Sequence, residues 1–259
     1  MDLGISGRKA IVCASSRGLG KACARALAEA GCEVVINGRD QKRLDATAAE
    51  LSNQTGGKII AVAADVATPE GQKALLAACP APDILINNNG GPPMRDFREL
   101  TRAQLIDGVI ANMVVAIELT QKVIEPMTQR KFGRIVNITS SSVMAPLAGL
   151  DLSSGARAGL TAFLAGVSRT VADKNVTINN ILPGAFDTDR LRGTLSKNAE
   201  QKGKSITQVA ADRIATIPAR RFGDPAEFGA ACAFLCSAQA GYITGQNLLI
   251  DGGTFNGAF

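Results

Sequence analysis

The sequence contains no histidine and no tryptophan, and Tyr242 is its single tyrosine. The lack of histidine excludes Ser-His-Asp and Cys-His nucleophile systems and any metal site built on imidazole. A mechanism that needs a phenol must use Tyr242. General acid–base chemistry near pH 7 is therefore left to carboxylates, lysines, perturbed cysteines and water.

Composition and charge narrow the class of protein further. Hydrophobic residues make up 46% and charged residues 20% of the 259 residues, which is typical of a soluble globular chain. The net charge of +5 comes without basic runs interleaved with aromatic residues, so nucleic acid is not an expected partner. The cysteines form no CxxC pair and no metal site is expected; they are predicted to be small buried hydrophobes in a reducing compartment: Cys13, Cys23, Cys32, Cys79, Cys232 and Cys236.

The sequence gives no sign of export or of membrane insertion. Residues 1–8 lack the apolar core of a signal peptide, and no apolar run reaches membrane-spanning length. We therefore expect a cytoplasmic protein without a membrane partner.

Short β-branched runs alternate with longer alanine-rich segments of helical period. The runs are almost continuously apolar, as in parallel strands covered on both faces, and they predict strands over residues 9–14, 33–37, 58–63, 83–87, 133–139, 176–182 and 247–250. Repeated β–α–β units without a linker predict the α/β class. We expect a single Rossmann-like domain over residues 1–259, with a doubly wound parallel sheet of about seven strands.

Helix-capping residues mark where the segments between the strands begin and end. Residues 18–30 have one apolar face and stop at Gly31, while Thr68 and Asp224 precede prolines as N-caps. Thr101 and Gln104 predict a capping box. Long helices are expected over residues 101–129 and 152–173.

One connection, residues 186–221, is too long for a plain loop and is predicted to be a substrate lid. It carries eight basic residues (Arg190, Arg192, Lys197, Lys202, Lys204, Arg213, Arg220, Arg221) against four acids (Asp187, Asp189, Glu200, Asp212), a net charge of +4. Such a charge favours anionic substrates at a pocket mouth, but it also suits a solvated pair of helices.

The first strand ends in a turn that opens the next helix, Cys13-Ala14-Ser15-Ser16-Arg17-Gly18-Leu19-Gly20. A turn of this kind aims backbone N–H groups and the positive end of the helix dipole at a pyrophosphate. By itself it is equally the sequence of an ordinary strand-to-helix turn.

Further motifs favour a phosphate-binding turn over an ordinary strand-to-helix turn. The chain resembles the short-chain dehydrogenase/reductase family, close to 3-oxoacyl-carrier-protein reductase-like members, over nearly its whole length. The family's TGxxxGxG turn falls on residues 13–20 with Ala14 in place of the first glycine, and other motifs fall on residues 65–66, 87–90, 112, 183–188 and 243–253. The resemblance implies that these residues hold a dinucleotide: Ala14, Ser15, Ser16, Arg17, Gly18, Leu19, Gly20, Asp65, Val66, Asn88, Gly90, Arg157, Pro183, Gly184 and Thr188.

The end of the second strand selects the nicotinamide cofactor. An acid there favours NAD through the ribose hydroxyl, whereas a cation favours NADP through the 2′-phosphate. Asp40 is a candidate acid, but it also stands where the next helix needs an N-cap, which is the role we favour. Because Arg39 and Arg17 offer guanidinium groups to a 2′-phosphate, we expect NADP(H) rather than NAD(H).

In the family, an asparagine, a serine, a tyrosine and a lysine cooperate in catalysis. The tyrosine exchanges the proton with the substrate oxygen, the lysine lowers the pKa of the tyrosine and holds the nicotinamide ribose, and the serine orients the carbonyl. Aligning residues 158–163 with the family places Asn112 and Ser140 at the first two positions. Ser153 then occupies the tyrosine position and Arg157 the lysine position, and no Tyr-x6-Lys pair of the enoyl-reductase kind exists.

Two functions follow from this altered site. Arg157 stays protonated and cannot be a base, but it can supply the positive charge of the lysine, while Ser140 and Ser153 donate hydrogen bonds to a carbonyl and water supplies the proton. We therefore expect an NADPH-dependent carbonyl reductase that is slow in the oxidative direction. The alternative is a degenerate nucleotide-binding sensor or oligomer subunit, in which Ser153 is solvated and Arg157 pairs with an acid.

Three smaller expectations complete the analysis. Asp151 is a spare candidate for proton transfer, although a cap or first-turn charge is the role we favour. The resemblance implies a homodimer or homotetramer built through the helices over residues 101–129 and 152–173. The basic lid and Gln129-Arg130-Lys131 fit a small carbonyl substrate that is anionic or carrier-bound, and solvated surface explains them equally well.

Overall fold

The computed structural model describes residues 2–91 and 94–258. Seven parallel strands form one sheet in the order β3-β2-β1-β4-β5-β6-β7. β1 pairs with β2 on one side and with β4 on the other, so the direction of winding reverses between β1 and β4, where ligands of such sheets bind. All seven predicted strands are confirmed, with ends that differ by at most two residues: β1 (Lys9–Val12), β2 (Glu33–Gly38), β3 (Ile59–Ala63), β4 (Ile84–Asn87), β5 (Gly133–Ile138), β6 (Val176–Pro183) and β7 (Asn247–Ile250).

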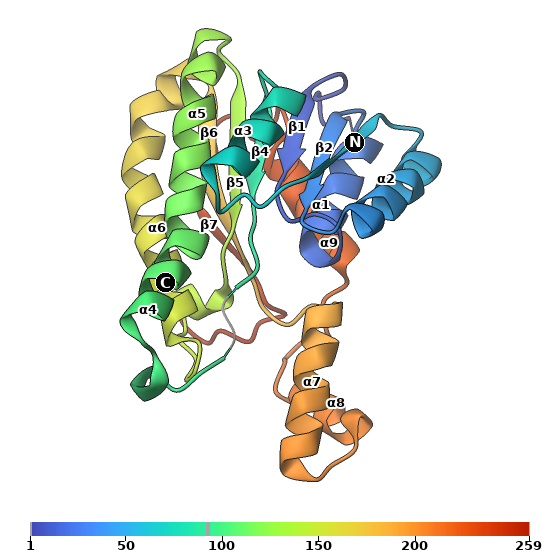
Figure 1. Cartoon of the computed structure of the whole chain (residues 1–259), viewed down its shortest axis with the longest axis vertical. Helices are drawn as coiled ribbons and strands as arrows, with labels where there is room; N and C mark the ends of the chain where they lie inside the picture. The colour runs from blue at the N-terminus through green and yellow to red at the C-terminus, as the bar shows by residue number, and fades with distance from the viewer. Residues whose placement is uncertain (1, 92–93, 259) are drawn as a thin grey trace.

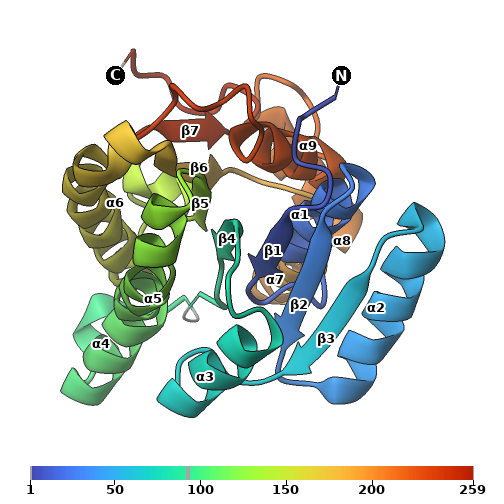
Figure 2. The same ribbon diagram turned by 90° about the horizontal axis from the view of Figure 1, so that it is seen from above.

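Helices cover both faces of the sheet (Figure 2). Three pack on one face: α1 (Gly18–Glu29), α2 (Gln41–Thr55) and α9 (Pro225–Leu235). Three others pack on the opposite face: α3 (Pro69–Ala78), α5 (Val115–Gln129) and α6 (Asp151–Val171). Side chains of one strand alternate between the two cores, since Ala10 and Val12 lie in the first and Ile11 in the second.

The predicted caps are present. The carboxylate of Asp40 accepts a hydrogen bond from the backbone N–H of Arg43 at 3.0 Å, and Thr68 caps α3 in the same way. The capping box of Thr101 and Gln104 is confirmed, and Asp224 caps α9. Asp151 is the first residue of α6, so its first-turn role is confirmed, and its carboxylate accepts from the N–H of Gly149.

The helix expected over residues 101–129 is not one regular helix. α4 (Arg102–Val109) and α5 are joined by a π-helical segment, Ile110–Val114, which widens one turn of the backbone. Such widened turns occur frequently at functional sites, and this one carries Asn112. The periodicity of apolar residues does not reveal one extra residue in a turn.

Residues 102–129 also correct the expectation that no apolar segment reaches membrane-spanning length. The continuous helix Arg102–Gln129, with a mean hydropathy of 1.4 in its most apolar window, is long and apolar enough to span a bilayer by length and composition alone. In the structure, Val115, Leu119, Val123 and Met127 of this helix lie buried in the core against the sheet. The apolar length therefore serves the packing of α5 in this fold.

Residues 186–221 form a pair of helices, α7 (Asp189–Lys202) and α8 (Ile206–Ala215), which extends away from the sheet as an arm (Figure 1). The two helices bury a small core of their own, formed by Leu195, Ala199 and Val209. A bridge between Phe186 and Gly223 ties the base of the arm together. The arm thus begins directly after β6, at the edge where the strands end.

Candidate active site

The turn between β1 and α1 has the close backbone approach that a phosphate site needs. Ala14, at the position of the family's first glycine, has a φ of 44° in the left-handed region. Its carbonyl accepts a hydrogen bond from Asn88 Nδ2 at 3.1 Å. A Cβ on Gly20 would lie 2.5 Å from that carbonyl oxygen and 2.8 Å from Asn88 Nδ2. Glycine is therefore required at position 20 to bring α1 against the end of β4.

Not every predicted residue of the turn points its side chain into the cleft. Ser15 is fully buried, and its hydroxyl donates to the carbonyl of Val12 at 2.7 Å and accepts from the N–H of Asn37 at 3.0 Å. Its backbone N–H also donates to the carbonyl of Asn37 at 2.7 Å, so both the side chain and the N–H of Ser15 fix β1 to β2 and neither is left for a ligand. Leu19 packs against the core. Arg17 is exposed at the N-terminus of α1.

The residues predicted for the adenine side meet at the ends of β2 and β3. Arg39 Nη1 lies 3.9 Å from Asp65 Oδ2, and the Arg39 side chain is 82% exposed. Ser16 lies against Gly38, where a Cβ would be 3.2 Å from its side chain. The side chain of Val66, in contrast, is buried in the core, so that the backbone is what it presents to a ligand.

The residues predicted for the nicotinamide side lie on β4, β6 and the start of the arm. A Cβ on Gly90 would meet no atom within 4 Å, so Gly90 faces open space. Gly184 follows Pro183 at the end of β6 and packs on Asp251, where a Cβ would be 2.7 Å away. Thr188 caps α7, and its Cγ2 lies 3.8 Å from the position of a Cβ on Gly18. The arm therefore starts beside the phosphate turn.

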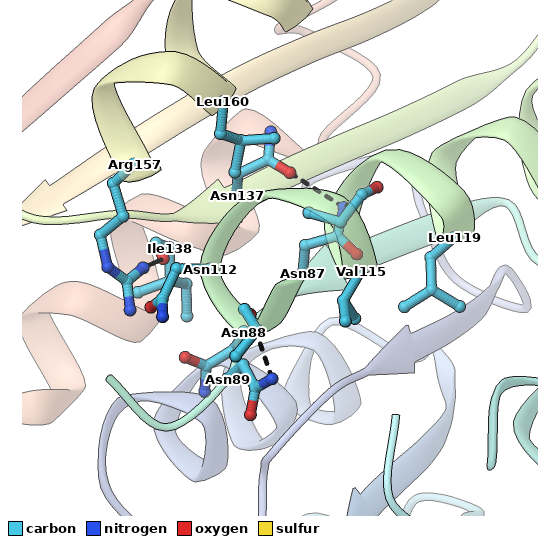
Figure 3. A pocket seen from close by; sticks show the side chains of 12 residues that line it. Asn87, Asn88, Asn89, Asn112, Val115, Leu119, Asn137, Ile138, Arg157 and Leu160 are labelled. Carbon is cyan, nitrogen blue, oxygen red and sulfur yellow. Dashed lines mark hydrogen bonds between the residues drawn. The ribbon is translucent and has the colours of Figure 1, made fainter. Parts of the chain in front are cut away.

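Ser153 and Arg157 lie one turn apart on the buried face of α6. Arg157 Nε donates a hydrogen bond to Ser153 Oγ at 3.2 Å, and Nη1 donates to the carbonyl of Ile138 at 2.6 Å (Figure 3). The two side chains belong to residues that are 6% and 7% exposed. The alternative of a solvated Ser153 is therefore wrong.

Within residues 2–91 and 94–258, no carboxylate lies within 4 Å of the Arg157 guanidinium, so the alternative of an ion pair is also wrong. Burial, and after it the charge of Arg190, lowers the pKa of Arg157 to about 10. This pKa is well above neutral pH, so Arg157 stays cationic. The site holds an uncompensated positive charge.

Ser140 follows β5 and faces the same end of the sheet. Its Oγ accepts hydrogen bonds from the N–H of Ser142 at 3.1 Å and from Ser142 Oγ at 2.8 Å. With its lone pairs engaged, the Ser140 hydroxyl has its own proton to donate. Ser140 and Ser153 thus both keep a hydroxyl proton to donate, and Ser153 lies in contact with Arg157.

Asn112 projects from the π-helical segment beside Arg157 (Figure 3). Its Nδ2 donates to the carbonyl of Gly108 at 3.0 Å. The sequence analysis did not single out Asn89 as a site residue, but its Nδ2 donates to the carbonyl of Ala111 at 3.1 Å and so ties the end of β4 to the widened turn.

A row of asparagine side chains crosses the sheet toward Asn112, and the sequence analysis missed it. Asn87 donates to Asn137 at 2.9 Å, Asn137 donates to Asn180 at 3.0 Å, and Asn180 donates to Asn247 at 2.8 Å. These residues are register partners on β4, β5, β6 and β7. The amide nitrogens of Asn87, Asn137 and Asn180 each donate toward β7, which leaves Asn87 Oδ1 at the β4 end of the row.

This row ends at a small cavity of about 20 Å³, which Asn112 and Arg157 also line. In the part of the chain that the structure describes, the buried Oδ1 atoms of Asn87 and Asn112 accept no hydrogen bond. Two acceptors and a guanidinium donor around a space of this size suit one water molecule.

The substitution Asn137→Ala removes the centre of the asparagine row. It removes the donor to Asn180 Oδ1 and leaves Asn87 Nδ2 only its longer bonds of 3.4 Å to Ala116 and Thr120. We expect the free energy of unfolding to fall by about 1–3 kcal/mol. Urea denaturation measures this change, and the exposed Asn53→Ala is the matched control. A loss below about 1 kcal/mol would show that the row contributes little to stability.

The remaining candidates lie outside the cleft. Tyr242 is fully exposed in a turn before β7, so its position before the last strand is as expected. All six cysteines are buried thiols, as predicted. Among the described residues, no group of three histidine, cysteine, aspartate or glutamate side chains is placed to hold a metal ion.

Comparisons with known proteins agree with this architecture. Residues 13–254 match a family model described as Enoyl-(Acyl carrier protein) reductase. The chain is 32% identical to the 3-oxoacyl-[acyl-carrier-protein] reductase FabG of Aquifex aeolicus, over 98% of this chain and 100% of that protein. It is 30% identical to the NADPH-dependent reductase BacG of Bacillus subtilis, over 96% of this chain and 98% of that protein.

Among solved structures, the L-sorbose reductase of Gluconobacter frateurii, complexed with NADPH and L-sorbose, superimposes with a TM-score of 0.94. The identity is 29%, and the match covers 99% of this chain and all of that one. The fold, the turn after β1 and the family match together identify the chain as a member of the short-chain dehydrogenase/reductase family of oxidoreductases.

Proposed function

We propose that this protein is an NADPH-dependent reductase of a carbonyl substrate, in which Ser153 and Arg157 replace the family's tyrosine and lysine. The observation that carries the proposal is the buried, unpaired Arg157 guanidinium hydrogen-bonded to Ser153 at the carboxyl end of β5. Burial removes the hydration of the Arg157 guanidinium, which is unfavourable for the folded protein. A catalytic role would account for a buried charge at this place, and stabilising a developing alkoxide is such a role.

The cleft fits the cofactor. The left-handed turn at Ala14 and the glycine at position 20 support a phosphate site at this turn, and Arg39 is exposed beside Asp65 at the distal end. Relatives whose names or structures include NADPH support the 2′-phosphorylated form. When bound, NADPH supplies the hydride. We expect Gly90, Thr188 and Arg157 to hold the nicotinamide half.

The chain's own residues would handle the substrate oxygen. Because Arg157 donates to Ser153 Oγ, the Ser153 hydroxyl is free to donate its proton in a hydrogen bond to that oxygen. Ser140 supplies a second hydrogen bond, and Arg157 supplies positive charge as the alkoxide develops. Water delivers the final proton, for which the cavity between Asn87, Asn112 and Arg157 offers a place.

None of Arg157, Ser153 and Ser140 is a base, and these side chains therefore favour one direction of the reaction. Alcohol oxidation needs a group that removes a proton, but a guanidinium cannot do so and a serine hydroxyl needs a base of its own. We expect reduction to be much faster than oxidation at neutral pH. Equal rates for a ketone and its alcohol would contradict this site.

The test of function is NADPH oxidation over a panel of β-ketoacyl thioesters, diketones, quinones and aldehydes. We expect turnover of at least one class, reduced in Arg157→Ala and Ser140→Ala. Tight NADPH binding with no turnover on any class would support a nucleotide-binding sensor or oligomer subunit instead.

Size-exclusion chromatography with light scattering tests the dimer or tetramer expected through α5 and α6.

The cofactor preference makes a separate prediction. Arg39→Ala removes a guanidinium that pairs with the 2′-phosphate, and we expect the Kd for NADPH to rise by about 10–100-fold while the Kd for NADH stays the same. Fluorescence titration measures both constants. Arg25→Ala, which removes the same charge from the exposed face of α1, is the control. Equal affinities for the two cofactors in the unaltered protein would overturn the preference.

A further inference from the structure

A cavity of about 260 Å³ adjoins the candidate active site, between α4, the start of α6 and residues 95–100. One wall is a single face of the helix that runs from α4 into the widened turn, formed by residues three or four positions apart: Gln104, Asp107, Gly108, Ala111 and Asn112. Leu152 of α6 lies opposite, with its Cδ2 2.5 Å from the place where a Cβ on Gly108 would be. Asn112 lines both this cavity and the smaller one beside Arg157.

The cavity has a closed end and an open end. Asn112 is only 4% exposed, whereas Asp107 and Arg95 are exposed to solvent. At a rise of 1.5 Å per residue, Asp107 lies roughly 7.5 Å along the helix from Asn112. The apolar residues Leu100 and Leu152 help to line the space. A ligand with an apolar middle can therefore reach from solvent to the end where the carbonyl is expected.

Asp107 and Arg95 bring opposite charges to different walls of this cavity. In the described part of the chain, no basic side chain lies within 4 Å of the Asp107 carboxylate, and no acidic one lies within 4 Å of the Arg95 guanidinium. The neighbouring Arg98, in contrast, pairs with Asp96 at 3.0 Å. The backbone N–H of Arg95 donates to the carbonyl of Gly149 at 3.0 Å, which fixes this loop against the chain that enters α6.

A carboxylate and a guanidinium that line one cavity without pairing select a ligand by its charges. A substrate with only a negative group is repelled by Asp107, and one with only a positive group is repelled by Arg95. A substrate with an ammonium and a carboxylate can bind to both side chains through charge-assisted hydrogen bonds. An amino acid holds these two groups on one carbon. Charge complementarity therefore favours an amino-acid group at the open end.

We propose that the substrate is an amino acid with a ketone in its side chain, whose ammonium binds Asp107 and whose carboxylate binds Arg95. The proposal rests on the proposed reductase function, which puts the ketone at the Asn112 end of the cavity. An extended chain advances about 1.3 Å per bond, so about five or six bonds separate the α-carbon from the ketone. Asp107 and Arg95 are then the residues that set specificity.

The test of specificity compares the reduction of 2-amino-7-oxooctanoate with that of analogues that lack one charge. 7-Oxooctanoate lacks the ammonium, and the methyl ester of the amino acid lacks the negative charge. We expect kcat/KM for the amino acid to exceed that for either analogue by about 5–50-fold, as a hydrogen bond to a charged group allows. An equal or higher kcat/KM for 2-hydroxy-7-oxooctanoate would assign the cavity to hydroxylated ligands and overturn the proposal.

Two variants should give a crossed pattern, which a structural role would not produce. Asp107→Asn should raise KM for the amino acid and its ester, but not for 7-oxooctanoate. Arg95→Gln should raise KM for the amino acid and 7-oxooctanoate, but not for the ester. Glu99→Gln and Arg102→Gln remove the same charges from exposed positions outside the lining, and they should keep the ratios of the unaltered protein. A uniform loss on all three compounds in Asp107→Asn and Arg95→Gln would contradict the assignment.

A binding measurement separates this proposal from the proposed function. 2-Aminooctanoate carries both charges but no ketone, so its binding to the NADPH complex, measured by calorimetry, needs no turnover. We expect its Kd to rise at least fivefold in Asp107→Asn and in Arg95→Gln. If no ketone is reduced but this rise is seen, the reductase function fails and the amino-acid site stands. If ketones are reduced but 2-aminooctanoate does not bind, or binds the variants as tightly as the unaltered protein, the amino-acid site is wrong.

Discussion

Arg157→Met is expected to lower kcat for carbonyl reduction by about 10²–10³-fold, the effect of removing a group that stabilises a developing oxyanion. Methionine has a similar length but neither charge nor N–H groups. Ser153 and Ser140 would keep their hydroxyls, yet the alkoxide would form without a neighbouring cation. Stopped-flow measurement of NADPH oxidation with saturating substrate gives the rate of this step.

The same substitution should not destabilise the fold. Arg157 loses hydrogen bonds to Ser153 and Ile138, but a buried charge without a carboxylate partner disappears with it. Replacing buried charges by apolar side chains is often neutral or stabilising, so the melting temperature should stay the same or rise by a few degrees. Arg169→Met, at an exposed position of α6, is the control. A drop in kcat below tenfold, or a collapse of Tm, would show that Arg157 has a structural role.

Gly20→Ala is expected to weaken NADPH binding by tenfold or more and to lower the free energy of unfolding by about 1–3 kcal/mol. The added Cβ would lie 2.5 Å from the carbonyl oxygen of Ala14 and 2.8 Å from Asn88 Nδ2. Because one of these atoms belongs to the backbone of the phosphate turn, the turn itself must move. Fluorescence titration with NADPH and urea denaturation measure the two effects.

Gly193→Ala provides the control for Gly20→Ala. A Cβ on Gly193, in the middle of α7, would meet no atom within 4 Å. Alanine should therefore stabilise that helix by up to about 1 kcal/mol and leave NADPH affinity unchanged. Equal behaviour of the two variants would mean that the close approach at Gly20 does not shape the cofactor turn.

The parts of the fold that depend on local signals could be predicted from the sequence. The strands are continuous apolar runs, and the caps at Asp40, Thr68 and Asp224 precede helices that begin within one residue. These features depend only on residues that are close to one another in the sequence.

The parts of the structure that depend on strand register or on side-chain direction could not be predicted from the sequence. The asparagine row requires Asn87, Asn137, Asn180 and Asn247 to face each other across four strands, and the only sequence signal is an asparagine in each of four predicted strands. The buried state of Ser153 depends on how α6 packs.

The central claim is that hydride transfer here proceeds without a phenol, and the most direct test uses the single tyrosine. Tyr242→Phe makes the protein free of tyrosine, and the replaced side chain is fully exposed in the turn before β7. We predict that this variant oxidises NADPH with a carbonyl substrate at the rate of the unaltered protein. Loss of reduction in Tyr242→Phe would contradict the account, because the missing proton donor would then be Tyr242.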